Sequence, residues 1–426
     1  MSVLRDPIRR RWLGWGALAL IFLLVNLHRL STAVLADRLT VDFAVSASQL
    51  GAVHAAFFIV YAVIQIPAGV IADRYGPRYV GAAGAIVLSL GAVGFAASTG
   101  FLDAFAARLV IGLGSGVIFI AILRYCANWF RVDEFATLTG LTGGIAGLGA
   151  ILATTPLAVT VGAVGWRPTV VGLAFVGLAT AGAVLVLVRR SPVRAGLDPI
   201  ERVPSQPTNT FSDARGHVSA LLADRTQWLL STMTFMALGT ILTIIGLWGV
   251  PYLVVVYDLG VTAASTYTLL GSLGILVGAP LVGWISDRTG RRLLPMVVGF
   301  GVMFVAIATI PVLGRPPLWV VAAAYFVIGF AVGFVMLGLT IIKERYPAGA
   351  SGVATATVNG AGFFGATAFP YVMGLVLDRY RTGDVVGGTV VYTEVGYRLA
   401  FAIVTIAVAI AFLSCTWLYL QDRAAR

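Results

Sequence analysis

A few polar and basic side chains interrupt the long apolar stretches of this sequence, and their types suit the binding of a small anion. The first stretch carries Arg29, with Asn26 three positions before it and His28 beside it. A guanidinium can bind a carboxylate through two parallel hydrogen bonds, and an imidazole exchanges protons near neutral pH. An ionisable group costs roughly 2.5–3.5 kcal/mol to insert into a membrane, which makes Arg29 the leading candidate for substrate contact. The alternative is an arginine that snorkels to the outer headgroups.

Other apolar stretches add further candidates for the substrate path: His54, Tyr61, Gln65, Arg124, Trp248, Tyr325 and Asn359. His54, Tyr61 and Gln65 fall on one helix face and could line a cavity, although such a stripe also suits packing. Arg124 could receive an anion from the cytoplasmic side or simply reach the inner interface. For the last three residues, packing is the alternative role.

Acidic side chains are absent from the predicted membrane spans, apart from Asp103 and Glu344 at their edges. A carrier of cations commonly places a carboxylate in the membrane to meet its substrate. The cationic or neutral interior therefore favours an anionic substrate. A single arginine suits a monoanion such as a carboxylate, and His28 or His54 could couple protons to its movement.

These side chains must be positioned by membrane helices, because the composition excludes a water-soluble globule. The 426 residues are 59% apolar and 11% charged, with a mean hydropathy of +0.95. Apolar and polar residues do not alternate in the apolar runs, so helices are favoured over a barrel. The sequence predicts twelve spans, near residues 12–35, 49–72, 79–98, 103–128, 136–160, 169–188, 228–255, 262–286, 294–313, 318–342, 351–377 and 399–420.

The net charge of +11 reflects orientation in a membrane and does not require nucleic-acid binding. Placing both termini in the cytoplasm puts most basic residues inside, as the positive-inside rule expects for an inner-membrane protein. The basic residues left outside are Arg38, Arg167, Arg315, Arg379, Arg381 and Arg398. The first apolar run lacks a cleavage site and is expected to be an uncleaved span. Cys126 and Cys415 lack the neighbours for a disulfide or a metal site and are expected to pack.

A charged string occurs twice, at residues 69–78 and 283–292, and both copies read G-x-x-x-D-R-x-G-x-R. Each copy lies between two apolar runs in one half of the chain, which indicates an internal duplication. The predicted organisation is a six-helix bundle at 1–188, a cytoplasmic linker at 189–226 rich in proline and polar residues, and a second bundle at 227–426.

The doubled string resembles the major facilitator superfamily, and the resemblance covers essentially the whole chain. The segment from Arg108 through Gly112 to Gly116 is similar to a second signature of that family, and Asn128-Trp129-Phe130 supports it. The resemblance implies an all-α membrane fold of twelve helices in two pseudo-symmetric bundles. Arg108 and Gly112 are then expected to be structural, with Arg108 bonded to nearby backbone.

The resemblance also implies a cytoplasmic latch that holds the two bundles together when the carrier faces outward. Its carboxylates would pair with arginines and with the positive end of a neighbouring helix. Topological anchoring by positive charge is the alternative. The expected latch residues are Gly69, Asp73, Arg74, Gly76, Arg78, Gly283, Asp287, Arg288, Gly290 and Arg292.

Arg29 is also similar to the first-span arginine of the organophosphate:phosphate antiporters, which hold phosphate with one arginine from each half. This sequence departs from that pattern, because Ile245 is the repeat partner of Arg29 and no basic residue lies between Leu229 and Val256. A two-arginine phosphate clamp is therefore not supported.

Together these features predict a monomeric secondary transporter of a small organic anion, working by alternating access with protons or a counter-anion as coupling ions. No cofactor, metal or catalytic group is expected, since no phosphate-binding loop or useful nucleophile occurs. Two alternatives remain: a proton-coupled exporter of amphipathic compounds, and a transporter-like membrane sensor or scaffold. Vesicle transport and counterflow of labelled ligand would distinguish them.

Overall fold

The computed structural model describes residues 6–198, 200, 203, 223–346, 348–386 and 389–425. Most of the predicted linker, 189–226, lies outside the described residues. The described residues up to 203 are called the N-terminal half, and those from 223 onward are called the C-terminal half.

The N-terminal half is entirely helical over its membrane-spanning part, because its apolar runs satisfy their backbone groups only within helices. Its helices are α1 (Pro7–Leu30), α2 (Thr32–Phe43), α3 (Ala47–Ala97), α4 (Phe101–Gly116), α5 (Ile118–Trp129), α6 (Val132–Leu152), α7 (Thr155–Val164) and α8 (Trp166–Leu187), followed by the short 3₁₀ turn η2 (Val193–Ala195).

The C-terminal half repeats this pattern and adds one small antiparallel hairpin near its end. Its elements are α10 (Arg225–Thr243), the π-helical segment η3 (Ile244–Trp248), α11 (Gly249–Tyr257), α12 (Val261–Thr289), α13 (Leu293–Leu313), α14 (Leu318–Phe330), α15 (Val332–Arg345), α16 (Ala348–Arg379), β1 (Arg381–Val386), β2 (Thr389–Tyr392) and α17 (Glu394–Ala425).

The described residues contain eleven helical segments long and apolar enough to cross a membrane, or twelve if α6 and α7, bent by 42°, form one span. This agrees with the predicted twelve-helix fold. Helix α3 supplies two of the spans, and Gly76 interrupts it with φ 81° and ψ 162°. Only glycine adopts such a conformation without strain, so Gly76 allows the chain to turn within the first charged string.

Several spans are broken within the membrane, which the sequence did not predict. The first span breaks at Ser31 between α1 and α2, and the seventh contains the π segment η3. The fourth breaks at Val117 and the tenth at Ala331, which are 331 − 117 = 214 residues apart. The same offset separates Asp73 from Asp287, so the charged strings and these breaks occur at matching positions in the two halves.

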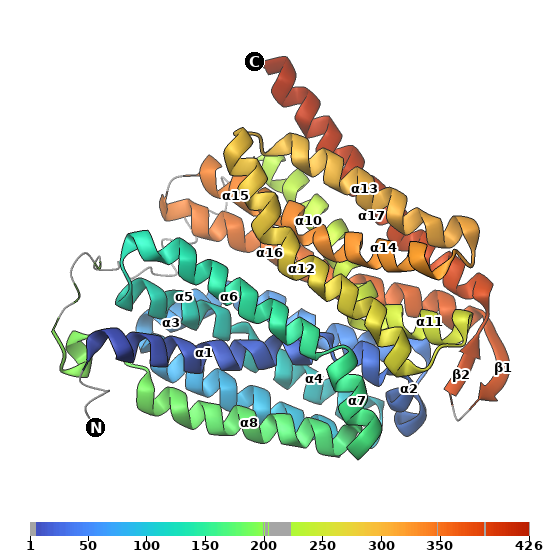
Figure 1. The fold of residues 1–426 in the computed structure, drawn as a ribbon, viewed down its shortest axis with the longest axis horizontal. Coiled ribbons are helices and arrows are strands. Elements are labelled where there is room, and N and C mark those ends of the chain that lie inside the picture. Colours follow the sequence, from blue (N-terminus) through green and yellow to red (C-terminus); the bar gives the residue numbers. More distant parts are fainter. Residues whose placement is uncertain are drawn as a thin grey trace.

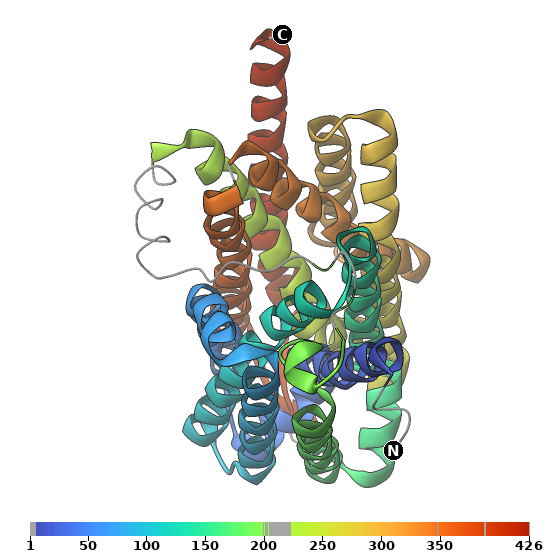
Figure 2. The ribbon, with the colours of Figure 1, turned by 90° about the vertical axis from the view of Figure 1, so that its left-hand side faces the viewer.

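The two halves lie against each other, with the blue-to-green helices below and the yellow-to-red helices above in both views (Figures 1 and 2). The N-terminus and the starts of α1 and α6 lie at the left of Figure 1, whereas α2, α11 and the β1–β2 hairpin lie at the right. We call the end that carries the two charged strings the hairpin end, because each string connects two membrane helices there. The opposite end, which carries α2, α11 and the small β1–β2 sheet, is called the far end.

The helices extend a few residues beyond the approximate limits of the predicted spans at the far end. Beyond the break at Ser31, the separate helix α2 carries Asp37, and α16 runs past residue 377 and includes Asp378. The membrane helices therefore carry carboxylates in addition to Asp103 and Glu344. Span limits drawn from hydropathy stop where polar residues first appear, whereas a helix can continue past them.

Candidate functional site

Arg29 lies in the last turn of α1, beside the break at Ser31, and its guanidinium faces three aromatic rings. The Arg29 Cζ atom is 4.8 Å from the ring centre of Tyr61, 5.9 Å from that of Phe57 and 5.4 Å from that of Phe363. We call Phe57, Tyr61 and Phe363 the aromatic cage. Because Phe363 comes from α16, the cage joins the two halves of the protein.

The polar contacts of Arg29 leave most of its donors for a ligand. Its Nη1 donates to Asn26 Oδ1 at 3.1 Å, and Asn26 Nδ2 donates in turn to the carbonyl of Phe22 at 2.8 Å. No carboxylate of the described residues forms an ion pair with Arg29. Each ring attracts the guanidinium by roughly 0.5–2 kcal/mol, but none carries a negative charge that would neutralise it. The site therefore suits an anionic ligand.

Arg108 maintains the helix break from which Arg29 projects. Its Nη1 donates to the carbonyl of His28 at 2.8 Å, and its Nη2 donates to Thr32 Oγ1 at 3.2 Å. The His28 carbonyl would otherwise accept from the amide of residue 32 within one continuous helix. Arg108 is 1% exposed, and its Cζ lies 5.3 Å from the ring of Phe57, which also faces Arg29.

Gly112 lets α4 approach α3 at the aromatic cage. A Cβ atom there would lie 2.3 Å from the carbonyl oxygen of Phe57, a distance that no side chain tolerates. Gly112 and Arg108, both in α4, thus hold Phe57 from one side of the cage. The sequence predicted a structural role for both residues.

His54 is buried where α3 meets the π segment of the other half. Its ring lies 5.2 Å from that of Phe58, and a Cβ atom on Gly246 would lie 3.0 Å from His54 Cε1. Its ring nitrogens make no well-formed hydrogen bond among the described residues, although the backbone of Leu242 lies close enough to interact with the ring. His28 is equally buried, and its Nε2 also lacks a partner there.

The remaining candidates divide between the cage and the packed core. Gln65 is buried one turn beyond Tyr61, and half-buried Asn359 lies one turn before Phe363, so both border the cage along their helices. Trp248 donates from Nε1 to the carbonyl of Pro370 at 3.0 Å, whereas Tyr325 donates to the carbonyl of Gly249 at 2.8 Å. These last two hydrogen bonds are made within the C-terminal half.

Arg124 lies away from the cage, at the first charged string. Its Nε is 3.0 Å from Asp73 Oδ1, and both side chains are largely buried. In the second string Asp287 pairs with Arg292, whose Nη2 also donates to Glu344 Oε1 at 2.9 Å. These ion pairs join residues of the same half.

Two other arginines of the strings, Arg74 and Arg288, lie on exposed aromatic rings. The Cζ of Arg74 is 5.5 Å from the ring centre of Tyr75, and that of Arg288 is 5.2 Å from Trp284. Gly290 ends α12 with φ 65°, and a Cβ atom on Gly69 or Gly283 would meet open space. A latch between the two halves stays a prediction.

A second acidic residue near the first string, Glu134, anchors the start of α1. Both oxygens of Glu134 accept from Arg11, at 2.9 Å each, and one also accepts from the amide of Arg131 at 3.0 Å. Partial burial alone would raise the pKa of Glu134, but these hydrogen bonds and charges hold it below its usual value.

At the far end the two halves are joined by a carboxylate on a helix start. Asp378, in α16, accepts from the amides of Ala47 at 2.9 Å and Ser48 at 3.0 Å, in the first turn of α3. Arg381 donates to the same carboxylate at 2.9 Å. The start of a helix is positive, so a carboxylate bound there is stabilised by charge as well as by hydrogen bonds.

Close backbone packing surrounds this contact. A Cβ atom on Gly374 would lie 2.5 Å from the carbonyl of Ala47, and one on Gly51 would lie 2.4 Å from the carbonyl of Pro370. We call this contact of α3 with α16 the ionic seam, defined by Gly51, Gly374 and Asp378.

The second seam, between α6–α7 and α12, is uncharged. Ser265 Oγ lies 3.3 Å from Thr155 Oγ1, and Ser272 Oγ donates to the carbonyl of Ala150 at 3.3 Å. Leu276 faces Gly147 one turn further toward the hairpin end, but a Cβ atom on Gly143 or Gly140 would meet nothing within 4 Å. The contacts of this seam thus run from Ser265 near the far end to Leu276, and the glycines of α6 nearer the hairpin end have open space beside them.

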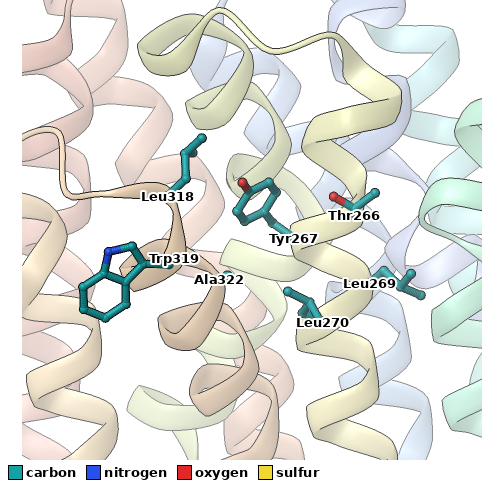
Figure 3. A pocket seen from close by; sticks show the side chains of 7 residues that line it. All are labelled: Thr266, Tyr267, Leu269, Leu270, Leu318, Trp319 and Ala322. Atoms are coloured by element: carbon teal, nitrogen blue, oxygen red, sulfur yellow. The ribbon is translucent and has the colours of Figure 1, made fainter.

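A pocket of about 360 Å³ lies between α12 and α14, near the far end of the C-terminal half (Figure 3). Tyr267 and Trp319 are its largest lining side chains, and Trp319 is mostly exposed. None of its lining residues is charged, so it does not offer the chemistry of the Arg29 site.

Two residues that complete these contacts were not predicted from the sequence. Phe363 has no repeat partner of the same type, although its position one turn after Asn359 placed it on a marked helix face. Asp378 fell one residue beyond the predicted end of its span. The position of Asp378 near the end of a helix could have marked it as a site of interaction. Its partner, the start of α3, could not be identified from the sequence.

Similar proteins are known for nearly the whole chain. It matches the model of the Major Facilitator Superfamily over residues 13–370 and 273–426. A probable sulfoacetate transporter of Cupriavidus necator is 26% identical over 89% of this chain and 90% of its own. A probable galactarate/D-glucarate transporter of Bacillus subtilis is 22% identical over 88% of each chain, and a hexuronate transporter of the same organism is 26% identical over 62% of this chain and 63% of its own.

Among solved structures, a bacterial homologue of the human lysosomal transporter Spinster superposes with a TM-score of 0.76. That structure is in an inward-facing, unoccupied conformation; it covers 97% of this chain and 98% of its own, at 17% identity. The likeness supports the arrangement of helices. The family match, the doubled charged string and the apolar helices agree, and the chain belongs to the Major Facilitator Superfamily as a multi-pass integral membrane protein.

Proposed function

We propose that the protein is a secondary transporter that moves a small organic monoanion, of carboxylate type, by alternating access. The observation that carries the proposal is Arg29, a guanidinium with no ion-pair partner among the described residues, held where rings from both halves meet. A bound anion would contact both halves at once. Its affinity would then depend on how the halves are arranged, which is what coupling between binding and movement requires.

The charge of the site favours a monoanion over a phosphate dianion. Arg108 lies on the other side of Phe57, and its two terminal nitrogens each donate a hydrogen bond within the protein, to the His28 carbonyl and to Thr32. Ile245 stands at the repeat position of Arg29, so the C-terminal half brings no matching cation. Relatives are named for sulfoacetate, hexuronate and galactarate or glucarate, and these names agree with a small organic acid as the substrate. Hexuronate is a monoanion whereas the others are dianions, so the preference for a monoanion rests on the charge of the site alone.

The movement would be a rocking of the two halves between seams at opposite ends. The ionic seam closes the far end in the present arrangement, and the two charged strings would close the hairpin end in the other one. By the positive-inside rule we place the hairpin end and both termini in the cytoplasm, with the protein in the inner membrane. His54, against Gly246 of the π segment, is our candidate for a coupled proton.

The test is uptake into proteoliposomes of labelled glucuronate, a monoanion, and of labelled sulfoacetate, a dianion that should be taken up less well, with an organic cation as a negative control. Loss of a charge-assisted hydrogen bond costs about 1.5–3 kcal/mol, so Arg29→Gln should raise the KM roughly 10- to 100-fold. Arg29→Lys should be intermediate, since it keeps the charge and loses the planar fork. Arg38→Gln, an exposed arginine on α2, is the matched control and should transport normally. Undiminished uptake of every anion by Arg29→Gln would refute the site.

A further inference from the structure

Two arginines from different spans converge on one carbonyl at the hairpin end of the N-terminal half. Arg78 Nε donates to the carbonyl of Leu185 at 2.8 Å, and Arg189 Nη1 donates to the same oxygen at 2.9 Å. Arg189 Nη1 also donates to the carbonyl of Val188 at 2.9 Å. Leu185 lies in the last turn of α8, so the two guanidiniums are gathered at the negative end of that helix.

The positive charge there exceeds what the protein supplies to balance it. Neither Arg78 nor Arg189 forms an ion pair with a carboxylate of the described residues. The end of a helix provides only about half a negative charge. Burial and the neighbouring guanidiniums of Arg78 and Arg10 lower the pKa of Arg189, as expected where like charges are held together.

The backbone that carries Arg189 is held rigidly. Trp129 Nε1 donates to the carbonyl of Arg189 at 2.9 Å, and Asn128 Nδ2 donates to that of Arg190 at 2.9 Å. Arg190 Nη2 in turn donates to the carbonyl of Asp73 at 2.9 Å. The two cations are therefore preorganised, which lowers the cost of binding an anion.

Two largely apolar side chains beside the pair are exposed at the surface of the bundle. Tyr79 and Val186, neighbours in sequence of Arg78 and Leu185, are each 58% exposed. The Arg78 Cζ atom lies 5.2 Å from the ring centre of Tyr79. Exposed apolar side chains on the spans of a membrane protein face lipid tails, and a tyrosine beside a cation is typical of the headgroup level.

We propose that Arg78 and Arg189 bind the phosphate of an anionic phospholipid in the leaflet at the hairpin end. The guanidiniums hold the phosphate oxygens, and an acyl chain of the same lipid lies along Val186 and Tyr79. A soluble anion would use the cations and leave the apolar surface unused. The combination of an uncompensated cation pair with a lipid-facing wall therefore favours a phospholipid.

The test is native mass spectrometry of the full chain released from membranes of phosphatidylglycerol and phosphatidylcholine in equal amounts. Two cations near an anionic lipid surface should strengthen binding roughly 30-fold, so Arg78→Gln/Arg189→Gln should lose most of its preference for phosphatidylglycerol. The matched control is Arg194→Gln/Arg423→Gln, which removes the same charge from exposed positions of the same face. The control should keep the preference of the unmodified protein.

A second variant and a second measurement guard against misfolding. Arg78→Lys/Arg189→Lys keeps both charges and should keep part of the preference. In nanodiscs, phosphatidylglycerol should raise the unfolding temperature of the unmodified protein and of the control over its value in phosphatidylcholine, and should do so less for the glutamine variant. Equal preference in the glutamine variant and its control would overturn the proposal. So would displacement of the retained lipid by millimolar inorganic phosphate, which would identify a soluble-anion site.

Discussion

Replacing Asp378 by asparagine should release the far end of the protein. The carboxylate accepts hydrogen bonds from two backbone amides of α3, and an asparagine side chain has one oxygen to offer. The loss of one charge-assisted hydrogen bond amounts to about 1.5–3 kcal/mol, and loss of the charge at a helix start adds about 0.3–1 kcal/mol. Because the carboxylate side chain is 19% exposed, we take about 2 kcal/mol after screening by solvent.

A destabilisation of about 2 kcal/mol changes the ratio of closed to open far ends roughly 30-fold. The assay is pulsed electron–electron distance measurement between spin labels on Val41→Cys in α2 and Val395→Cys in α17. Both positions are exposed on different halves at the far end, whereas the native Cys126 and Cys415 are buried. Asp378→Asn should move population from a short to a long distance.

The matched control is Asp103→Asn, which changes a carboxylate at the same end of the molecule. Asp103 accepts from Thr99 Oγ1 at 3.0 Å, a contact within one half, so its loss should leave the distance distribution unchanged. If Asp378→Asn and Asp103→Asn gave the same distribution as the unmodified protein, the ionic seam would not hold the far end closed.

Three further predictions concern a buried arginine, a seam glycine and a carboxylate at the hairpin end. Arg108→Ala should lower the unfolding free energy by about 2–4 kcal/mol in chemical denaturation, since it removes two buried hydrogen bonds, and a near-normal value would contradict its structural role. Gly374→Val should open the far end in the same spin-label assay without any change of charge, because its side chain would meet the carbonyl of Ala47; an unchanged distance would show that the seam can yield. Partial burial would raise the pKa of Asp224, but hydrogen bonds from Arg345, Tyr346 and a backbone amide hold it below its usual value. The stabilisation that Asp224 provides is thus complete above its unfolded-state pKa near 4, and it is lost as the pH falls through the lower folded-state pKa. The difference in unfolding temperature between the unmodified protein and Asp224→Asn should therefore narrow on acidification. A constant difference from about pH 7 to pH 3 would refute this.

The sequence predicted the spans well because each apolar run is visible without knowledge of its neighbours. Arg29 and Tyr61 could be placed near each other because they lie on consecutive spans. The contact of Arg29 with Phe363 could not be predicted, since it depends on how the two halves dock. The break at Ser31 was hidden for a similar reason: it is maintained by Arg108, which is distant in sequence.

The predicted span limits differ by a few residues from the helix ends where a polar residue lies inside the last turn of a helix. Asp378 falls just beyond the predicted span, yet it lies inside the helix, and its side chain is bound by amides of another helix. The latch at the two charged strings stays a prediction, because each carboxylate pairs within its own half in this arrangement.

The two seams of the far end differ in their tolerance of water. At the seam of Ser265 and Thr155, a water molecule can replace either hydroxyl partner with little change in energy. At the ionic seam, glycine backbones leave no room for water between the helices, and the carboxylate already satisfies the amides that water would seek. Hydration during opening should therefore begin between α7 and α12 and spread toward α3 and α16. The uncharged seam is then the first place where a leak of small solutes would arise, and the ionic seam is the last to part.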